Sequence, residues 1–224
     1  MEAQEDSRLS LLVNAGGRSR RMGRDKALLA TPGGGSLLER VVRRLYPLAS
    51  GRVVVVANNP ALAAALPAEL GVRFVADQWP DGGALGGLAS GLAYCEGWTM
   101  AVACDMPFVE AALFRYLAEV AQAPGAAWDA VVPVVGGRAQ VFHALYHVRS
   151  LDALRASLAA GRLAVREALA ALRVCWVEEA ALAAVGDVAA SVFNANTPAE
   201  WRAAQQRMIQ ETNDRQNDSA GRLP

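Results

Sequence analysis

The sequence predicts an α/β fold in which an open, mostly parallel sheet carries helices on both faces. Two observations support this class: short apolar strands alternate with helical segments along most of the chain, and a glycine-rich loop follows the first strand. The chain has 224 residues, of which 53% are hydrophobic, and this is enough for one sizeable core. We therefore expect a single domain over residues 9–207.

The strands are predicted where apolar, often β-branched runs end in turn residues. They span residues 10–13, 52–57, 72–76, 99–104, 130–135 and 139–147, with weaker strands at 173–177 and 191–193. Apolar residues at helical spacing, or an alanine-rich composition, predict the helices. These span residues 37–48, 60–70, 88–95, 110–121 and 150–171, and Pro198 opens a last helix. The polar tail 208–224 has too little apolar surface to repay the entropy of ordering. We expect this tail and residues 1–8 to be disordered.

The charge balance and the apolar runs exclude several classes of function. The 22 acidic residues cancel the 22 basic ones, so the chain lacks the broad positive surface of a general nucleic-acid or membrane binder. The apolar stretches are too short to span a membrane, and the acidic N-terminus does not fit a secretory signal. The three cysteines show no metal-ligand spacing and are interpreted as reduced thiols. We expect a cytoplasmic protein without nucleic-acid or membrane partners.

One basic residue stands out from the others. Twenty-one of the 22 basic residues are arginine, and Lys26 is the single lysine. Arginine serves as well as lysine on most solvated surfaces, whereas a tight phosphate site distinguishes a compact ammonium from a planar guanidinium. Lys26 is therefore a candidate phosphate ligand. Before the polar tail, asparagine likewise occurs only at the ends of predicted strands, at positions 14, 58, 59, 194 and 196.

Lys26 closes a loop that begins at residue 15. Glycines at positions 16, 17 and 23 let backbone N–H groups approach an anion closely, and arginines at positions 18, 20 and 21 add positive charge. The P-loop pattern is absent because no Ser or Thr follows Lys26, and the G-x-G-x-x-G spacing of dinucleotide folds is absent as well. The loop therefore predicts a phosphate cradle of another kind.

Asp105 follows the strand at residues 99–104 and comes two residues before a proline. A carboxylate in this place suits Mg²⁺, which proteins hold through one or two carboxylates while substrate phosphates complete its shell. The alternative role is a helix N-cap, which is common for Asp. Ligands of open α/β sheets bind at the carboxyl ends of the strands. We therefore expect Asp105, Mg²⁺ and Lys26 to converge on one triphosphate.

Four segments follow one another in a recognisable order: NAGGRSRRMGRDKALL, DQWPDGGALGGLASGL, ACDMPFV and VFNANTP. Together they resemble the molybdenum cofactor guanylyltransferases, over nearly all of residues 9–204. The resemblance implies a Rossmann-like nucleotidyltransferase fold. It also implies an Mg²⁺-dependent enzyme that joins GMP from GTP to the terminal phosphate of molybdopterin and releases pyrophosphate. Molybdoenzyme chaperones or other cofactor-biosynthesis proteins are expected as partners.

The resemblance also assigns roles to single residues. The turn after the first strand would hold the guanine and ribose, and an aspartate can accept the N1 and N2 protons of guanine. The residues that would bind GTP are Asn14, Ala15, Gly16, Gly17, Lys26, Asn58, Asp77 and Asp105.

Three of the implied residues are catalytic. Lys26 and Arg21 would hold the phosphates, and Asp105 would carry Mg²⁺. Asn194 and Asn196, in the N-x-N-T-P pattern, would face the molybdopterin side. Because the phosphomonoester of the acceptor itself attacks the α-phosphorus, catalysis would consist of in-line positioning and charge neutralisation.

The sequence departs from the family in the guanine-side segments, and other functions stay open. Asn14 replaces a usually aliphatic residue, so the role implied for that position rests on backbone contact alone. Residues 83–87 read GALGG in place of G-P-L-A-G, and this change predicts a looser guanine-side loop. The alternatives are cytidylyl transfer to the same pterin, whose enzymes tend to carry A-A-G rather than A-G-G, nucleotidyl transfer to a sugar phosphate, and a non-catalytic nucleotide-binding carrier. His143 and His147 lie on a predicted strand and are expected to have core or surface roles.

Overall fold

The computed structural model describes residues 8–16 and 25–220, with side chains described up to residue 214. Eight strands form one sheet, in the order β3-β2-β1-β4-β7-β5-β6, and β8 pairs with the other side of β5. The strands are β1 (Leu9–Asn14), β2 (Val53–Val56), β3 (Arg73–Val75), β4 (Trp98–Ala103), β5 (Ala130–Val135), β6 (Arg138–Ala139), β7 (His143–His147) and β8 (Val174–Glu178).

The first four strands form the parallel half of the sheet. β1 lies between β2 and β4, and β3 flanks β2, all in parallel register. β2 is a run of four buried valines, as expected for a strand covered on both faces. The carboxyl ends of β1, β2 and β4 therefore meet at one edge of the sheet, where ligands bind in open α/β folds.

The second half of the sheet contains two antiparallel strands, β6 and β7. The turn at Gly136 and Gly137, both with positive φ, reverses the chain after β5. The single strand predicted over residues 139–147 is divided in two because the chain turns after Ala139, where His143 N donates to the Gln140 carbonyl at 3.0 Å.

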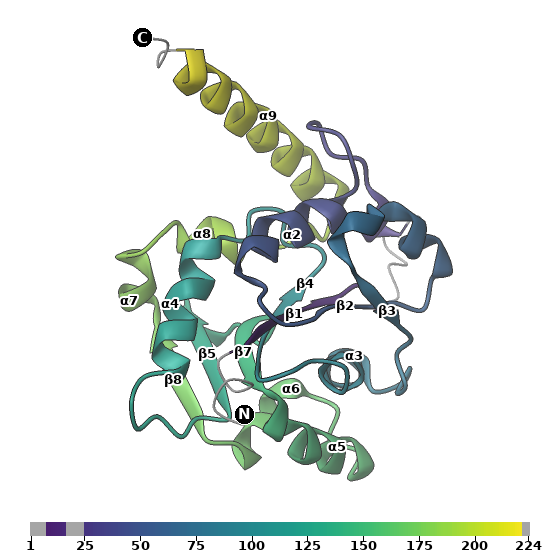
Figure 1. Ribbon diagram of the computed structural model, residues 1–224, viewed down its shortest axis with the longest axis vertical. Coiled ribbons are helices and arrows are strands. Elements are labelled where there is room, and N and C mark those ends of the chain that lie inside the picture. The colour runs from purple at the N-terminus through teal and green to yellow at the C-terminus, as the bar shows by residue number, and fades with distance from the viewer. Residues whose placement is uncertain (1–7, 17–24, 221–224) are drawn as a thin grey trace.

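Helices cover both faces of the sheet (Figure 1). One face packs against α2 (Leu37–Leu45), α4 (Ala111–Ala121), α7 (Glu179–Ala183), α8 (Val188–Ser191) and α9 (Pro198–Ala220). The other packs against α3 (Gly83–Leu92), α5 (Leu151–Ala159) and α6 (Val165–Ala168). This arrangement confirms the predicted α/β class. None of the helices in the described ranges is long and apolar enough to cross a membrane.

Two elements differ in type from the prediction. Residues 60–70 form two 3₁₀ helices, η3 (Pro60–Ala65) and η4 (Ala68–Leu70), separated at Pro67, which lacks the backbone N–H that a continuous α-helix needs. The remaining 3₁₀ helices are η1 (Lys26–Leu28), η2 (Tyr46–Leu48), η5 (Val148–Ser150) and η6 (Leu169–Ala171). The strand predicted at residues 191–193 is wrong, because Asp187 caps helix α8 by accepting from Ala190 N at 3.0 Å.

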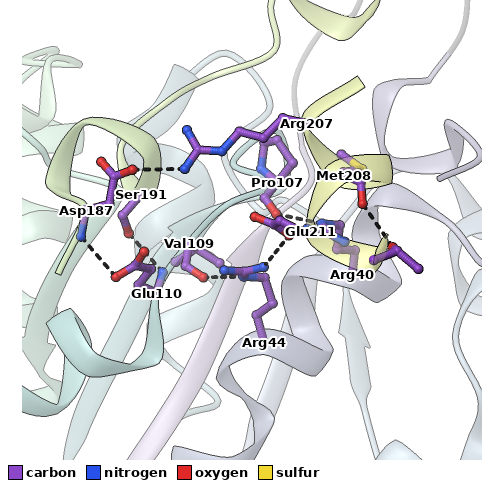
Figure 2. Close-up of polar contacts among 11 residues, drawn as sticks. Arg40, Arg44, Pro107, Val109, Glu110, Asp187, Ser191, Arg207, Met208 and Glu211 are labelled. Atoms are coloured by element: carbon purple, nitrogen blue, oxygen red, sulfur yellow. Dashed lines mark hydrogen bonds and ion pairs between the residues drawn. The ribbon is translucent and has the colours of Figure 1, made fainter. Parts of the chain in front are cut away.

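The structure also differs from the predicted domain boundary at residue 207. Helix α9 runs on to Ala220, and its residues beyond 207 include Met208, which is only 1% exposed. Glu211 binds Arg40 and Arg44 of α2 (Figure 2). The helix is thus docked by a buried side chain and ion pairs, which a composition argument does not detect. At the other terminus, Arg8 pairs with Glu96 at 2.9 Å, while residues 1–7 lie outside the described ranges.

Candidate functional site

The turn after β1 lies at the carboxyl edge of the sheet. Ala15 N donates to the Val56 carbonyl of β2 at 2.9 Å. Asn14 Oδ1 accepts from Gly16 N at 3.1 Å, an interaction in which the side chain of Asn stabilises a turn two residues on. Three of the predicted GTP-binding residues are therefore held in one turn. Gly17 and Arg21 lie outside the described residues.

Lys26, Asp105 and Asn196 converge beside this turn, although up to 170 residues separate them. Lys26 Nζ donates to Asp105 Oδ2 at 3.3 Å and to Asn196 Oδ1 at 2.8 Å. The lysine and aspartate side chains are only 13% and 19% exposed. The structure thus brings Lys26 and Asp105 together, and Asn196 completes the cluster.

Backbone hydrogen bonds fix the position of Asp105. It follows β4, and the amide of the preceding residue, Cys104, donates to the Asn14 carbonyl at 3.1 Å. The amide of Ala195 donates to the Asp105 carbonyl at 2.9 Å. The end of β4 is therefore joined both to the glycine turn and to the segment before α9.

Asp25 is a site residue that the sequence analysis missed. Its Oδ1 accepts from Ala27 N at 3.1 Å and so caps η1, the element that carries Lys26. Its Oδ2 accepts from Asn59 Nδ2 at 2.9 Å, which ties the lysine to the loop after β2. Two signals were available in the sequence. Asp25 comes directly before the only lysine, and Asp is common at helix N-caps; Asn59 follows the end of a predicted strand.

Asn58 and Asp77 form a second polar group at the same edge. Asn58 Oδ1 accepts from Asp77 N at 2.9 Å. Asp77 Oδ1 accepts from Trp79 N at 2.9 Å and from Ser90 Oγ at 3.1 Å. Ser90 is fully buried in α3 and was also missed, because a single serine in a helix gives no signal in the sequence. The two predicted residues are thus joined to each other and to α3.

The glycines of residues 83–87 do not loosen the guanine-side segment as predicted. They begin helix α3, and Gly86 and Gly87 are both buried. A Cβ on Gly86 would lie 2.4 Å from the Trp79 carbonyl oxygen, and one on Gly87 would lie 2.8 Å from Asn14 Oδ1. The unusual asparagine and the glycine opposite it therefore fit together, because Gly87 leaves the space that the Asn14 amide occupies.

Asn194 is not joined to the cluster. Its Nδ2 donates to the Val192 carbonyl at 2.9 Å, a local contact. Glu200, by contrast, was missed and lies beside Asn196: its carboxylate accepts from the backbone amides of Asn196 and Thr197 at 2.7 and 2.8 Å. These two amides lower the pKa of the Glu200 carboxyl. The signal was T-x-x-E at the start of the last helix, a capping box.

The surroundings disfavour the thiolate form of Cys104, which precedes Asp105. Burial, together with the Asp105 and Asp25 carboxylates, raises the pKa of the Cys104 thiol, so it stays protonated. Among the described residues, no three His, Cys, Asp or Glu side chains are grouped as a metal cluster. His143 and His147 are buried, as a core role requires. What the site offers is an ammonium, a carboxylate, an amide and a turn of backbone N–H groups.

These features define the class of the protein. A glycine turn after the first strand of an open α/β sheet, with a lysine and an aspartate at the same edge, is suited to binding a nucleoside triphosphate and moving its phosphate groups. The chain is a nucleotidyltransferase.

Comparison with known proteins then gives the family. The chain belongs to the family of MobA-like NTP transferase domains, whose sequence pattern matches residues 11–176. It is 40% identical over 205 residues to a Chloroflexus aggregans protein named "Probable molybdenum cofactor guanylyltransferase", with 88% of this chain and 93% of that protein covered. A protein of the same name from Pelotomaculum thermopropionicum is 34% identical over 194 residues, with 84% and 88% covered. The resemblance of the four sequence segments is thereby confirmed.

A solved structure supports the fold. Molybdopterin-guanine dinucleotide biosynthesis protein A from Archaeoglobus fulgidus matches with a TM-score of 0.74 over 90% of this chain and 99% of that one. The two sequences are 24% identical, so the likeness concerns the architecture. It confirms the nucleotidyltransferase fold.

Proposed function

We propose that this protein transfers GMP from GTP to the terminal phosphate of molybdopterin, forming the guanine dinucleotide and pyrophosphate. The observation that carries the proposal is the position of Lys26 Nζ, which binds Asp105 at the nucleotide edge and Asn196 in the NANTP segment. One cation thus contacts both segments that the two substrates would approach. The names of the two curated relatives support the choice of guanylyl and of molybdenum cofactor.

The reaction needs positioning and charge neutralisation. An oxygen of the acceptor phosphate forms a bond to the α-phosphorus of GTP, and the bond from that phosphorus to the bridging oxygen breaks, so that pyrophosphate leaves with the electron pair. Lys26 would neutralise the phosphate charge that develops, with Arg21 as a second cation. Because the acceptor supplies the attacking oxygen, no protein nucleophile is required, in agreement with a protonated Cys104.

The donor set fits Mg²⁺ as the cofactor. Asp105 Oδ2 binds Lys26, and its Oδ1 makes no hydrogen bond to any other described residue. A single carboxylate is sufficient, because phosphate oxygens and water usually complete the shell of this ion. Asp105 would hold it, and the bound ion would supply neutralisation of phosphate charge.

Guanine would be recognised at the second polar group. Asp77 Oδ1 is occupied by Trp79 N and Ser90 Oγ, whereas its Oδ2 has no partner among the residues that the structure describes. This oxygen could accept the N1 and N2 protons of guanine, which cytosine, adenine and uracil do not present in the same pattern. Asn58, whose side-chain oxygen accepts from the backbone N–H of Asp77, would position Asp77. Asn194 and Asn196 are proposed to lie on the molybdopterin side.

The first test is nucleotide binding by calorimetry with Mg²⁺, comparing GTP with CTP, ATP and UTP. We expect a clear preference for GTP. A preference for CTP would move the protein to cytidylyl transfer, and absence of binding would contradict the proposal. The Asp77→Asn variant should lose the preference, because an amide replaces one acceptor with a donor.

The second test is release of pyrophosphate from GTP in the presence of molybdopterin. Asp105→Asn should lower the rate by about a hundredfold or more, which is the usual effect of removing one group that stabilises the transition state electrostatically. Asp152→Asn, on the exposed surface of α5, removes the same charge away from the site and should have no effect. Turnover with a sugar phosphate but not with molybdopterin would identify another acceptor. Binding of GTP without turnover would identify a carrier.

A further inference from the structure

Helix α9 is attached to the site at its amino end. Glu200 accepts from Asn196 N and Thr197 N, and Glu200 N donates back to Thr197 Oγ1 at 3.2 Å. This capping box fixes the backbone of Asn196, whose side chain accepts from Lys26 Nζ. Glu200 therefore determines where the amide that binds Lys26 lies.

The same helix is attached a second time, three turns further on. Glu211 accepts from Arg40 at 2.5 Å and from Arg44 at 3.4 Å. The two guanidinium groups also donate to backbone carbonyls, Arg40 Nε to Pro107 at 2.7 Å and Arg44 Nε to Val109 at 2.6 Å (Figure 2). Glu211 thus pairs with two mostly buried arginines that hold the segment directly after Asp105.

Packing joins the two attachments. The guanidinium groups of Arg40 and Arg207 both contact the Phe108 ring, 5.7 and 4.7 Å from its centre. Arg207 also pairs with Asp187 beside α8 at 2.9 Å. Met208 is buried in the same core cluster as Phe108. The chain that follows β4 is therefore contacted by both α2 and α9.

We propose that α9 is a positioning element for the site, with Glu200 and Glu211 as its positioning residues. Glu200 sets Asn196 against Lys26, and Glu211 sets the backbone that carries Asp105. Neither carboxylate touches a substrate group in this account. A displacement of about 1 Å at a reacting group can lower a rate about a hundredfold, so residues this far from the chemistry can govern turnover. The turnover part of the test rests on the proposed function.

The first readout does not depend on any reaction. Lys26 is the only lysine of the chain, so an amine-acylating reagent has two targets, Lys26 and the α-amino group, which serves as an internal reference. Acylation of each is followed by mass spectrometry. We expect Glu200→Gln and Glu211→Gln to raise the relative rate at Lys26 about tenfold, the effect of losing about one charge-assisted hydrogen bond. Asp214→Asn, an exposed site one turn beyond Glu211, should leave it unchanged.

The second readout separates positioning from substrate binding. In both variants we expect kcat to fall about tenfold or more while KM for GTP changes less than about twofold, because the guanosine contacts lie on other elements. Leu169→Ala controls for stability. It creates a cavity on the opposite face of the sheet, lowers the melting temperature, and should leave Lys26 acylation and kcat at their wild-type values.

The results distinguish this inference from the proposed function. Unchanged Lys26 acylation in folded Glu200→Gln and Glu211→Gln proteins would overturn the inference, even if the wild type makes the guanine dinucleotide. An equal increase of the Lys26 acylation rate in Leu169→Ala would overturn the inference as well, because the exposure of Lys26 would then depend on overall stability alone. If Glu211→Gln does not fold, Arg44→Gln tests the same attachment from α2. Faster acylation of Lys26 in the variants, with no guanylyl transfer by either the wild type or the variants, would support the positioning role and reject the proposed function.

Discussion

Acidification between pH 7 and pH 5 is expected to destabilise the protein through His143. The ring is fully buried on β7 against Phe114, with ring centres 4.5 Å apart. Its Nε2 lies 2.6 Å from Ser191 Oγ, which already accepts from Glu110 N. Nδ1 has no hydrogen-bond partner among the described residues. Protonation would therefore bury a charge without a counter-ion, and burial lowers the pKa of His143 to about 4.

The size of the effect follows from linkage between protonation and folding. The pKa of the His143 ring is about 6.5 in the unfolded chain and about 4 in the folded chain, so the folded chain takes up this proton only at lower pH. Stability is thus fully present above pH 6.5 and is lost as the pH falls towards 4. At about 1.4 kcal/mol per pKa unit the total is about 3 kcal/mol, of which about 2 kcal/mol is lost between pH 7 and pH 5.

Urea unfolding at pH 7, 6 and 5 measures this loss. The His143→Gln protein is less stable, but its stability should depend on pH by about 2 kcal/mol less over the same range. The Asp129 carboxyl, whose pKa the Arg173 side chain lowers to about 2, loses its contribution only below about pH 4 and does not interfere. Equal pH dependence in wild type and variant, or an NMR titration of the His143 ring near 6.5, would refute the reasoning.

Three further outcomes are expected. Lys26→Arg should lower kcat about a hundredfold or more with little change in melting temperature, because a planar guanidinium does not fit between the two groups that bind the ammonium; wild-type activity would remove Lys26 from the mechanism. Gly91→Ala should destabilise the protein by about 1–3 kcal/mol in urea unfolding, because its Cβ would lie 2.3 Å from Leu12 Cδ1; an unchanged midpoint would show that α3 shifts freely. Deleting the residues after Arg207 should lower the melting temperature, because the buried Met208 is lost; the composition of the tail predicts no change.

The sequence predicts the elements best where local signals agree with the fold. Asn14 and Asp105 were located at strand ends because the apolar runs stop there, and parallel strands bring those ends together. Lys26 was singled out by composition. Their mutual distances could not be predicted, nor could the contact of Lys26 with Asn196, because pairing across 170 residues depends on how α9 packs.

The elements predicted poorly are those whose order comes from tertiary contacts. The polar residues of α9 suggest a tail, yet Glu211 and Met208 find partners on α2 and in the core. Ser191 was assigned to a strand because apolar residues surround it, whereas the cap from Asp187 makes it helical. Asp25 was overlooked because its second contact, with Asn59, depends on how the loop after β2 packs against η1.

The contact between Asn196 and Lys26 has a consequence for protein synthesis. The glycine turn, Lys26 and Asp105 all belong to the first half of the chain, whereas Asn196 and the helix that fixes it are translated much later. Domains fold largely as units while the ribosome is still at work. Because the chain folds as one domain, the contact between Lys26 and Asn196 can form only after the last helix has emerged. Until then, the Lys26 ammonium lacks one of the two side chains that bind it.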